Sequence, residues 1–326
     1  MTDNYKESSL YKFYLNSPYR SVKHSGYFQV YEDVLKNYIN KKITFVEIGI
    51  HNGGSLFMWR EFLGDSARII GIDLNPKAKE FEKYGFEIFI GDQSDKKFWK
   101  NFFYEVGNID ILIDDGGHTY EQQIITVVSA IDFIKNNGMI IIEDTHTSYF
   151  KKFGYPTKFT FVNWSKKIID NINSRSEEVL ISNPIYKNTI HSIEFFESIV
   201  VFKIDKDKSY DSKPTSNESK TFNFEDYRFY NSGFNKIINY LNNIEKNLYP
   251  KKEKNLLIKL ILKINSFLLI NYESFINNKK TRKMKKYFWV SKIASFIYYF
   301  SNEGNTNFHF VTFWESSHSA IYLSQI

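Results

Sequence analysis

Two stretches of this 326-residue chain decide its fold: Ile109-Asp110-Ile111-Leu112-Ile113-Asp114-Asp115-Gly116-Gly117-His118 and, further along, Met139-Ile140-Ile141-Ile142-Glu143-Asp144. Each is a run of apolar, mostly β-branched residues that ends in acidic side chains. Such runs are typical of strands buried on both faces of a parallel sheet. Ligands bind these sheets at the carboxyl ends of the strands. We therefore expect the acidic residues and His118 to face one crevice.

The acidic residues at these two strand ends predict a cation site. Carboxylates that lie close together repel one another unless a cation neutralises them. Four carboxylates are candidates here: Asp114, Asp115, Glu143 and Asp144. Ligand sets made of oxygen atoms favour a hard ion such as Mg²⁺. The sequence thus indicates a magnesium site with a histidine beside it.

A glycine-containing turn follows an earlier strand, in Ile43-Thr44-Phe45-Val46-Glu47-Ile48-Gly49-Ile50-His51-Asn52-Gly53-Gly54-Ser55. Glycines let the backbone approach a ligand closely, and the helix expected over Leu56–Leu63 offers free N–H groups at its start. The glycine spacing differs from that of the dinucleotide-binding fingerprint, and Glu47 stands at the strand end. An acid there disfavours a pyrophosphate and suits a cationic or amino-bearing ligand.

Two further strands end in acids in the same way. The strand predicted over Ala67–Asp73 ends in Asp73, and the strand predicted over Phe86–Ile90 is followed by Gly91-Asp92-Gln93-Ser94-Asp95. A carboxylate at the second strand end typically accepts hydrogen bonds from ribose hydroxyls. Acids that end apolar strands are costly without a partner. These strand ends therefore predict the nucleoside half of a ligand site.

Three successive strand ends that carry Glu47, Asp73 and Asp92 resemble the class I S-adenosylmethionine-dependent methyltransferases. Four motifs in order resemble, more narrowly, the metal-dependent sugar O-methyltransferases of the macrocin and mycinamicin type, to which cephalosporin-hydroxylase-type proteins are also similar. They are Gly91–Asp95, Asp114–His118, Ile142–Tyr149 and a late strand over Ile193–Val201. The resemblance covers residues 20–205. It implies an α/β, doubly wound, mostly parallel seven-stranded Rossmann-like sheet, with an N-terminal helical lid and a C-terminal helical extension.

The same resemblance implies roles for particular residues. The metal ligands fall on Asp115, Glu143 and Asp144, and the general base falls on His118. Residues expected to bind S-adenosylmethionine are Glu47, Gly49, Gly53, Ser55, Asp73, Asp92, Gln93 and Asp114. The chain departs from the family at Gly117, where Ser is common, and at His146, an additional imidazole. The base therefore stays open between His118 and His146.

Purely structural explanations compete with these roles. Asp114 and Asp115 could cap the helix predicted over Tyr120–Phe133, and His118 could be only a hydrogen-bond donor at its start. Glu143 and Asp144 could simply solvate a loop.

Composition limits the class of protein. The chain has no cysteine, which excludes disulfides and thiolate metal sites, and no apolar run long enough to predict a membrane-spanning helix. We expect no signal peptide and a cytoplasmic, homo-oligomeric enzyme. Three regions are predicted: a helical lid over 1–40, a methyltransferase core over 41–208 and a basic, aromatic-rich extension over 209–326. Within the lid, the segment Lys23–Tyr27 and Tyr31 partly resemble a family segment that closes over cofactor and substrate, although an ordinary surface helix is the alternative.

The positive charge is concentrated in the C-terminal extension. The whole chain carries +6, whereas residues 251–286 alone hold 11 Lys or Arg and 2 Glu. Apolar helices are predicted over Leu256–Ile270 and Met284–Phe300. Three interpretations stay open for this region: an intramolecular cap or dimerisation element, peripheral contact with an anionic membrane through 251–300, and a hold on a phosphorylated substrate. Nucleic-acid binding is not expected, because no recognition motif accompanies the charge.

Together these features predict O-methylation of a sugar hydroxyl by S-adenosylmethionine with Mg²⁺. The resemblance favours a surface-polysaccharide sugar or its nucleotide-activated precursor, with a capsular heptose as one candidate. The sugar, the hydroxyl and the carrier are not identified by the sequence. The alternatives are a methyltransferase for a small catechol-like diol and a non-catalytic cofactor-binding module in a glycan assembly complex.

Overall fold

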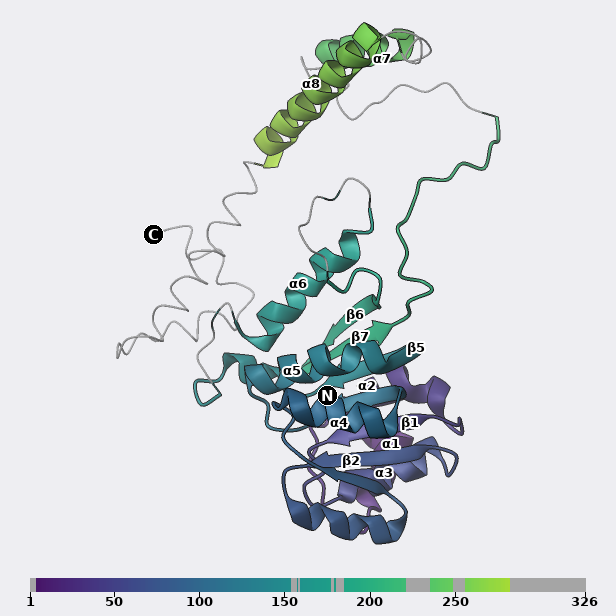
Figure 1. Cartoon of the computed structure of the whole chain (residues 1–326), viewed down its shortest axis with the longest axis vertical. Coiled ribbons are helices and arrows are strands. Elements are labelled where there is room, and N and C mark those ends of the chain that lie inside the picture. Colours follow the sequence, from purple (N-terminus) through teal and green to yellow (C-terminus); the bar gives the residue numbers. More distant parts are fainter. Residues whose placement is uncertain are drawn as a thin grey trace. The chain divides into compact units, whose positions relative to one another are not determined.

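The structure, a computed structural model, describes residues 4–153, 157, 159–176, 179, 185–220, 235–248 and 256–281. The chain divides into two compact units, Met1–Pro214 and Thr215–Ile326 (Figure 1). The first unit contains the sheet and the strand ends singled out by the sequence, so the candidate site lies within it.

The first unit is built on a seven-stranded sheet. Its strands are β1 (Thr44–Ile48), β2 (Arg68–Asp73), β3 (Glu87–Ile90), β4 (Ile109–Asp114), β5 (Ile134–Ile142), β6 (Ile190–Phe196) and β7 (Ile199–Ile204). They lie in the order β3-β2-β1-β4-β5-β7-β6. The pairs from β3 to β5 are parallel, and β7 runs antiparallel to both of its neighbours. The predicted seven-stranded, mostly parallel sheet is confirmed.

Helices cover both faces of the sheet. One core contains buried side chains of α1 (Ser9–Leu15), α2 (Tyr27–Leu35) and α3 (Gly54–Leu63), and the other contains those of α4 (Lys96–Val106), α5 (Tyr120–Ala130) and α6 (Phe161–Asn173). Strand β4 contributes Ile111 and Ile113 to the first core and Leu112 to the second. This alternation explains the apolar run, because successive side chains of a strand point to opposite faces. The fold is doubly wound, as predicted.

Short 3₁₀ helices join several of these elements. They are η1 (Asn4–Glu7), η2 (Lys36–Tyr38), η3 (Pro76–Tyr84), η4 (Ile131–Phe133) and η5 (Thr145–Tyr149).

The register of the parallel strands brings the predicted acids to one edge. Ile48 pairs with Ile72 of β2 and with Asp114 of β4, and Asp114 in turn pairs with Ile142 of β5. The residues that follow these positions therefore leave the sheet side by side. The order of the strands reverses at β1 and β4, which is the switch point where such sheets bind ligands.

One local expectation needs correction. The late strand expected over Ile193–Val201 is a hairpin of β6 and β7, because Ser198 adopts a left-handed conformation at φ 61° and reverses the chain. Most of the described residues of the N-terminal region are helical, as predicted, but residues 16–26 between α1 and α2 are largely extended or turn-like. This extended segment carries Lys23 into the candidate site.

The second unit consists, in its described part, of α7 (Asn235–Leu248) and α8 (Leu256–Thr281). The helices pack through the buried side chains of Ile238, Leu241 and Leu262, and Asn265 Nδ2 donates to the Leu241 carbonyl over 2.9 Å. Within the described ranges, no helix has the length and apolar character needed to cross a bilayer. The predicted helix Met284–Phe300 and most of the basic run at 279–286 lie outside the described residues, so the three interpretations of the extension stay predictions.

Candidate active site

A cavity of about 350 Å³ lies at the carboxyl ends of β1, β2, β3 and β4. Its walls include four of the residues predicted to bind the cofactor: Gly49, Asp73, Asp92 and Gln93. Asp115 also lines it, and no lysine or arginine does so among the described residues. Three carboxylates in a lining without lysine or arginine disfavour a pyrophosphate and suit a ligand with positive charge.

Backbone geometry shapes this cavity at Gly49. This residue has φ +84°, and a Cβ atom there would lie 2.1 Å from the Asp115 carbonyl oxygen. The loop after β4 can therefore approach the loop after β1 only if glycine stands here. At the next strand end, Asp73 Oδ2 accepts from the His51 N–H over 3.0 Å and its Oδ1 accepts from the Asn75 N–H over 2.8 Å. These bonds hold the carboxylate at the rim of the cavity.

The other four predicted cofactor residues do not line the cavity. Glu47, Gly53, Ser55 and Asp114 are buried behind it. Gly53 is the N-cap of α3, and Ser55 Oγ donates to Glu47 over 2.6 Å. Their direct contact with a cofactor stays a prediction, and their visible role is to support the cavity wall.

Asp114 and Gln93 form a buried scaffold below the glycine loop after β4. Gln93 Nε2 donates to both carboxylate oxygens of Asp114 over 2.9 and 2.8 Å, while its Oε1 accepts from the Gly117 N–H over 2.9 Å. Burial raises the pKa of Asp114, although the hydrogen bonds from Gln93 and the Gly116 N–H oppose this shift. The scaffold positions the loop that carries Asp115 and His118.

The acids after β4 and β5 surround a buried lysine. The side chain of Lys23 is 1% exposed, and its Nζ lies 2.7 Å from Asp115 Oδ2, 2.9 and 3.0 Å from the two oxygens of Glu143, and 3.5 Å from Glu47 Oε1. The ammonium of Lys23 therefore supplies part of the positive charge that the acidic strand ends require.

The electrostatics of this cluster remain unbalanced. Burial would lower the pKa of Lys23, but the attraction of Asp115, Glu143 and Glu47 outweighs it and raises that pKa well above its ordinary value. Burial, together with the charge of Asp115, raises the pKa of Glu143 well above its ordinary value despite Lys23. Burial likewise raises the pKa of Glu47. One ammonium faces three carboxylates, so negative charge is in excess.

A second group lies beside this cluster and joins Asp115 to Asp144 and His118. His118 Nε2 lies 3.5 Å from Asp144 Oδ2 and 4.0 Å from Asp115 Oδ1, and suitable ligand atoms of the three residues lie within 4.8 Å of one another. Asp144 is anchored by the Tyr27 hydroxyl, which donates to its Oδ1 over 2.5 Å. The structure thus brings Asp115, Asp144 and His118 together, whereas both oxygens of Glu143 bond to Lys23.

Both His118 and Asp144 have left-handed backbones, with φ of 60° and 53°. Such conformations cost free energy in residues other than glycine and often mark functional sites. Thr147 Oγ1 donates to the His118 carbonyl over 2.9 Å and ties the two loops together. Thr119, not Asp114 or Asp115, is the N-cap of α5 and forms a capping box with Gln122. The helix-cap explanation of those two acids is therefore wrong.

His146, the other candidate base, lies on η5 beside His24. The two rings are 5.3 Å apart at 80°, and His146 Nδ1 is buried without a hydrogen-bond partner among the described residues. His118 Nδ1 is also buried without one in the same part of the chain. His118 lies nearer the junction with the cavity, because it contacts Asp115.

The roles of Lys23, His24 and Tyr27 are not assigned by sequence reasoning beyond their partial resemblance to a closing segment. The clustered acids could have pointed to Lys23, since buried carboxylates that lie close together need a cation, and a lysine side chain can supply it. The three residues stand at the end of an extended segment and the start of α2, where no periodicity predicts which strand end they meet.

Comparison with known proteins agrees with this geometry. Residues 46–145 match a family model described as a methyltransferase domain. This region runs from β1 to the loop after β5 and includes all the predicted cofactor and metal residues and His118, whereas His146 lies just beyond it.

Two named relatives are similar over part of the chain. The mycinamicin VI 2''-O-methyltransferase of Micromonospora griseorubida is 26% identical over 187 residues, which are 51% of this chain and 46% of the relative. The demethylmacrocin O-methyltransferase of Streptomyces fradiae is 30% identical over 131 residues, 38% of this chain and 33% of the relative. The chain thus spans less than half the length of either relative. The resemblance to the macrocin and mycinamicin enzymes is confirmed.

A solved structure is similar in fold. The MycE methyltransferase of the mycinamycin biosynthetic pathway, in complex with Mg, SAH and mycinamycin VI, matches with a TM-score of 0.56 and 24% identity. The match covers 65% of this chain and 57% of that one. At this identity the likeness concerns the fold, and it agrees with the Rossmann-like methyltransferase architecture described above.

Proposed function

We propose that this protein transfers the methyl group of S-adenosylmethionine to a sugar hydroxyl, with Mg²⁺ as a second cofactor. One observation carries the proposal: Asp115 lines the acidic cavity and also belongs to the group with Asp144 and His118. A cofactor in the cavity and an acceptor hydroxyl near His118 would therefore both lie next to Asp115. The relatives named above methylate mycinamicin VI at a 2''-oxygen and demethylmacrocin, and both support a sugar-bearing acceptor.

The cavity suits the cofactor for chemical reasons. S-adenosylmethionine carries a sulfonium and an ammonium, and the cavity lining has carboxylates without a lysine or arginine among the described residues. Asp73 is proposed to accept hydrogen bonds from the ribose hydroxyls, and Asp92 to face the adenine amine. Gly49 and the loop after β4 leave room for the methionine part. Glu47 supports this wall from behind through Ser55.

The residues present also fit a divalent cation. Asp115 Oδ1 and both oxygens of Asp144 lie outside the contacts of Lys23, and one ammonium leaves the three acids around it with excess negative charge. Asp115 and Asp144 would hold the ion, and Glu143 would join them where Lys23 releases one of its oxygens. A bound Mg²⁺ lowers the pKa of a hydroxyl and fixes its position.

The protein's own residues account for the proton. The acceptor oxygen attacks the methyl carbon in line with the breaking carbon–sulfur bond, and the cofactor leaves as a neutral thioether. The hydroxyl proton then needs an acceptor, for which we propose the neutral imidazole of His118. General bases of this kind contribute about 10²–10⁴-fold in rate. Asp115 and Asp144 orient that imidazole and would stabilise it after it takes the proton.

A turnover assay tests the proposal. The full chain would be incubated with S-adenosylmethionine, Mg²⁺ and a panel of nucleotide-sugars, glycosylated macrolides and catechols, and S-adenosylhomocysteine would be measured. We expect turnover with at least one sugar class, loss of turnover in EDTA and its return with Mg²⁺. Turnover with catechols alone would contradict the sugar acceptor. Cofactor binding without turnover across the panel would favour a non-catalytic binding module.

A further inference from the structure

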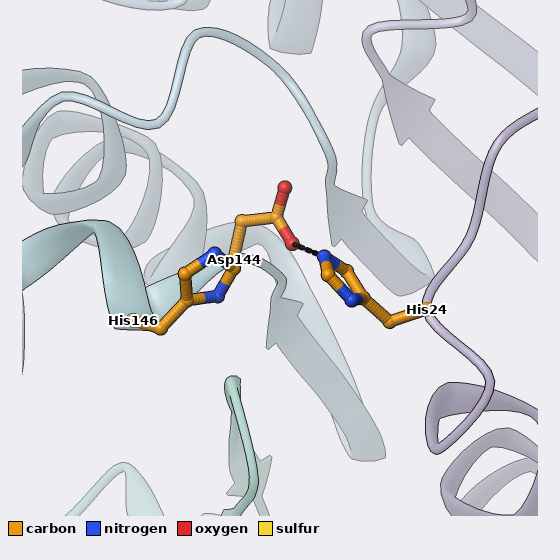
Figure 2. A group of neighbouring side chains, drawn as sticks. All are labelled: His24, Asp144 and His146. Carbon is orange, nitrogen blue, oxygen red and sulfur yellow. Dashed lines mark ion pairs between the residues drawn. The ribbon is translucent and has the colours of Figure 1, made fainter.

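Three side chains from two distant parts of the chain meet beside the proposed catalytic group. His24 precedes α2, whereas Asp144 and His146 flank the start of η5 (Figure 2). His24 Nε2 lies 3.8 Å from Asp144 Oδ1, and one ligand atom from each residue lies within 4.8 Å of the others. This group shares Asp144 with the group of Asp115 and His118 but has its own two imidazoles.

The donor set of this group differs from that of the magnesium site. Two imidazoles and one carboxylate suit Zn²⁺, Co²⁺, Ni²⁺ or Cu²⁺, whereas Mg²⁺ prefers oxygen ligands. Bonds from zinc to these ligands are about 2.0–2.2 Å, so ligand atoms around a tetrahedral ion lie roughly 3.4 Å apart. The present group must therefore close by roughly an ångström.

The structure allows such a closure from one side. The side chain of His24 is 64% exposed, so its ring can move toward Asp144 without disturbing the core. Asp144 is held in place by the Tyr27 hydroxyl, and the His146 ring packs on Phe150 at 5.0 Å. Two ligands are thus held by neighbouring side chains and the third is exposed at the surface, where an ion can reach it from solvent.

The neighbouring charges leave this carboxylate available. Lys23 contacts Glu47, Asp115 and Glu143 but is not paired with Asp144. With both imidazoles neutral, Asp144 gives the group one negative charge, and a divalent ion would compensate it.

We propose that His24, Asp144 and His146 form a separate binding site for a borderline transition-metal ion. Occupation of this site engages Asp144, which the magnesium group also uses, and draws His24 toward it. Resting on the function proposed above, the consequence for activity is inhibition by such ions. The binding itself does not depend on that function.

Cobalt absorption spectroscopy tests the binding directly. The metal-free full chain would be titrated with Co²⁺, whose visible bands report nitrogen ligands and a low coordination number, with no need for turnover. We expect one saturable equivalent. His24→Ala and His146→Ala should each weaken binding by about 10-fold or more, because loss of even an outer partner of a metal ligand costs about 10–100-fold.

Two controls locate the site. His191→Ala changes a histidine of β6 that belongs to neither group and should leave the titration unchanged. His118→Ala removes the imidazole of the magnesium group and should also leave the cobalt bands in place. Loss of the bands in His118→Ala, their persistence in His24→Ala, or the lack of saturable binding in the wild type would each overturn the proposal. His24 is exposed, so its variant decides the matter even if His146→Ala fails to fold.

Inhibition is a separate measurement. In the sugar methylation assay, Zn²⁺ should inhibit the wild type and should inhibit His24→Ala about 10-fold more weakly. Cobalt binding without zinc inhibition in an active enzyme would overturn the proposed competition for Asp144. A protein that binds cobalt as expected but never turns over would instead contradict only the function proposed above.

Discussion

The two halves of the candidate site accommodate their carboxylates in different ways. In the cofactor half, Asp73 and Asp92 lie partly exposed at strand ends and accept backbone hydrogen bonds from loops at the same edge of the sheet. In the acid half, the buried Glu47 and Glu143 and the partly buried Asp115 face the ammonium of Lys23, which is distant in sequence from all three.

This difference has consequences for stability and for function. A partly exposed carboxylate is solvated and tolerates the loss of a neighbour, so its substitution should mainly affect ligand binding. A buried group of charges depends on every member, because the removal of one leaves the others uncompensated. Loss of a buried charge in the acid half should therefore lower the free energy of unfolding, and mutations in the cofactor half should leave it nearly unchanged.

Lys23→Met should produce the largest effect and tests this contrast most directly. The change leaves Glu47, Asp115 and Glu143 without their common cation, and breaking a buried pair in this way costs about 3–5 kcal/mol. The free energy of unfolding would be measured by urea denaturation, with the fluorescence of the buried Trp59 and Trp99 as the signal.

The matched control for this variant is Lys42→Met, which changes an exposed lysine and should cost less than about 0.5 kcal/mol. Mg²⁺ should also stabilise Lys23→Met more than it stabilises the wild type, because a divalent ion can replace the lost charge. If the two lysine variants were equally stable, Lys23 would not be the counter-ion of the acid half.

His118→Ala should lower kcat by about 10²-fold or more, equivalent to about 2.7 kcal/mol in the barrier. The affinity for S-adenosylmethionine, measured by calorimetry, should stay the same because His118 does not line the cavity. His146→Ala serves as the comparison under saturating Mg²⁺. Turnover that vanishes in His146→Ala and persists in His118→Ala would assign the base to His146.

The cofactor half was predictable from sequence because its information is local. Apolar runs that end in Asp73 and Asp92 specify both a buried strand and the position of its acid, and parallel strands present these ends at one edge. Strands buried on both faces follow from the same runs, whereas the seven-stranded sheet is implied by the family resemblance. Asp115, Asp144 and His118 also meet as expected, since they follow neighbouring strands β4 and β5.

The acid half was only partly predictable because it depends on a contact between distant residues. Lys23 and Asp115 are 92 positions apart, and Lys23 lies on a segment without a helical or strand pattern. The hairpin of β6 and β7 also has no local signal in the sequence. Its turn at Glu197–Ser198 contains neither Gly nor Pro, so the segment Ile193–Val201 resembles one continuous strand.

Asp73→Ala should weaken the binding of S-adenosylmethionine by about 1–3 kcal/mol, since the variant loses hydrogen bonds to the ribose. The protein should remain folded, in contrast to Lys23→Met. Calorimetric titration measures the affinity, and Asp65→Ala, an exposed acid in the loop before β2, is the control. An unchanged affinity in folded Asp73→Ala would remove this residue from the cofactor site.

The smallest effect on stability is expected at an exposed ion pair between β2 and β3. Arg68 Nη2 lies 2.6 Å from Glu87 Oε2, and the two side chains are 40% and 45% exposed. Exposed pairs contribute about 0.2–1 kcal/mol, so Glu87→Gln should cost no more than that at pH 7. The hydrogen bond from Arg68 lowers the pKa of Glu87 below 4.5. Between its folded and unfolded pKa values, the folded state thus binds fewer protons. The stability difference should therefore be present above pH 4.5 and disappear as the pH falls through the lowered pKa.

The contribution of Lys23 to stability should change at alkaline pH. Because the pKa of Lys23 is raised above 10.5, its contribution is fully present below that pH and is lost as the pH rises through the folded value. Melting temperatures of both variants and the wild type from pH 3 to pH 11 measure the two differences. The gap between wild type and Glu87→Gln should close only in acid, and the larger gap for Lys23→Met should narrow in strong alkali. A Lys23→Met gap that closes near pH 5 would mean that protonation of the acids, not the lysine, balances the buried cluster.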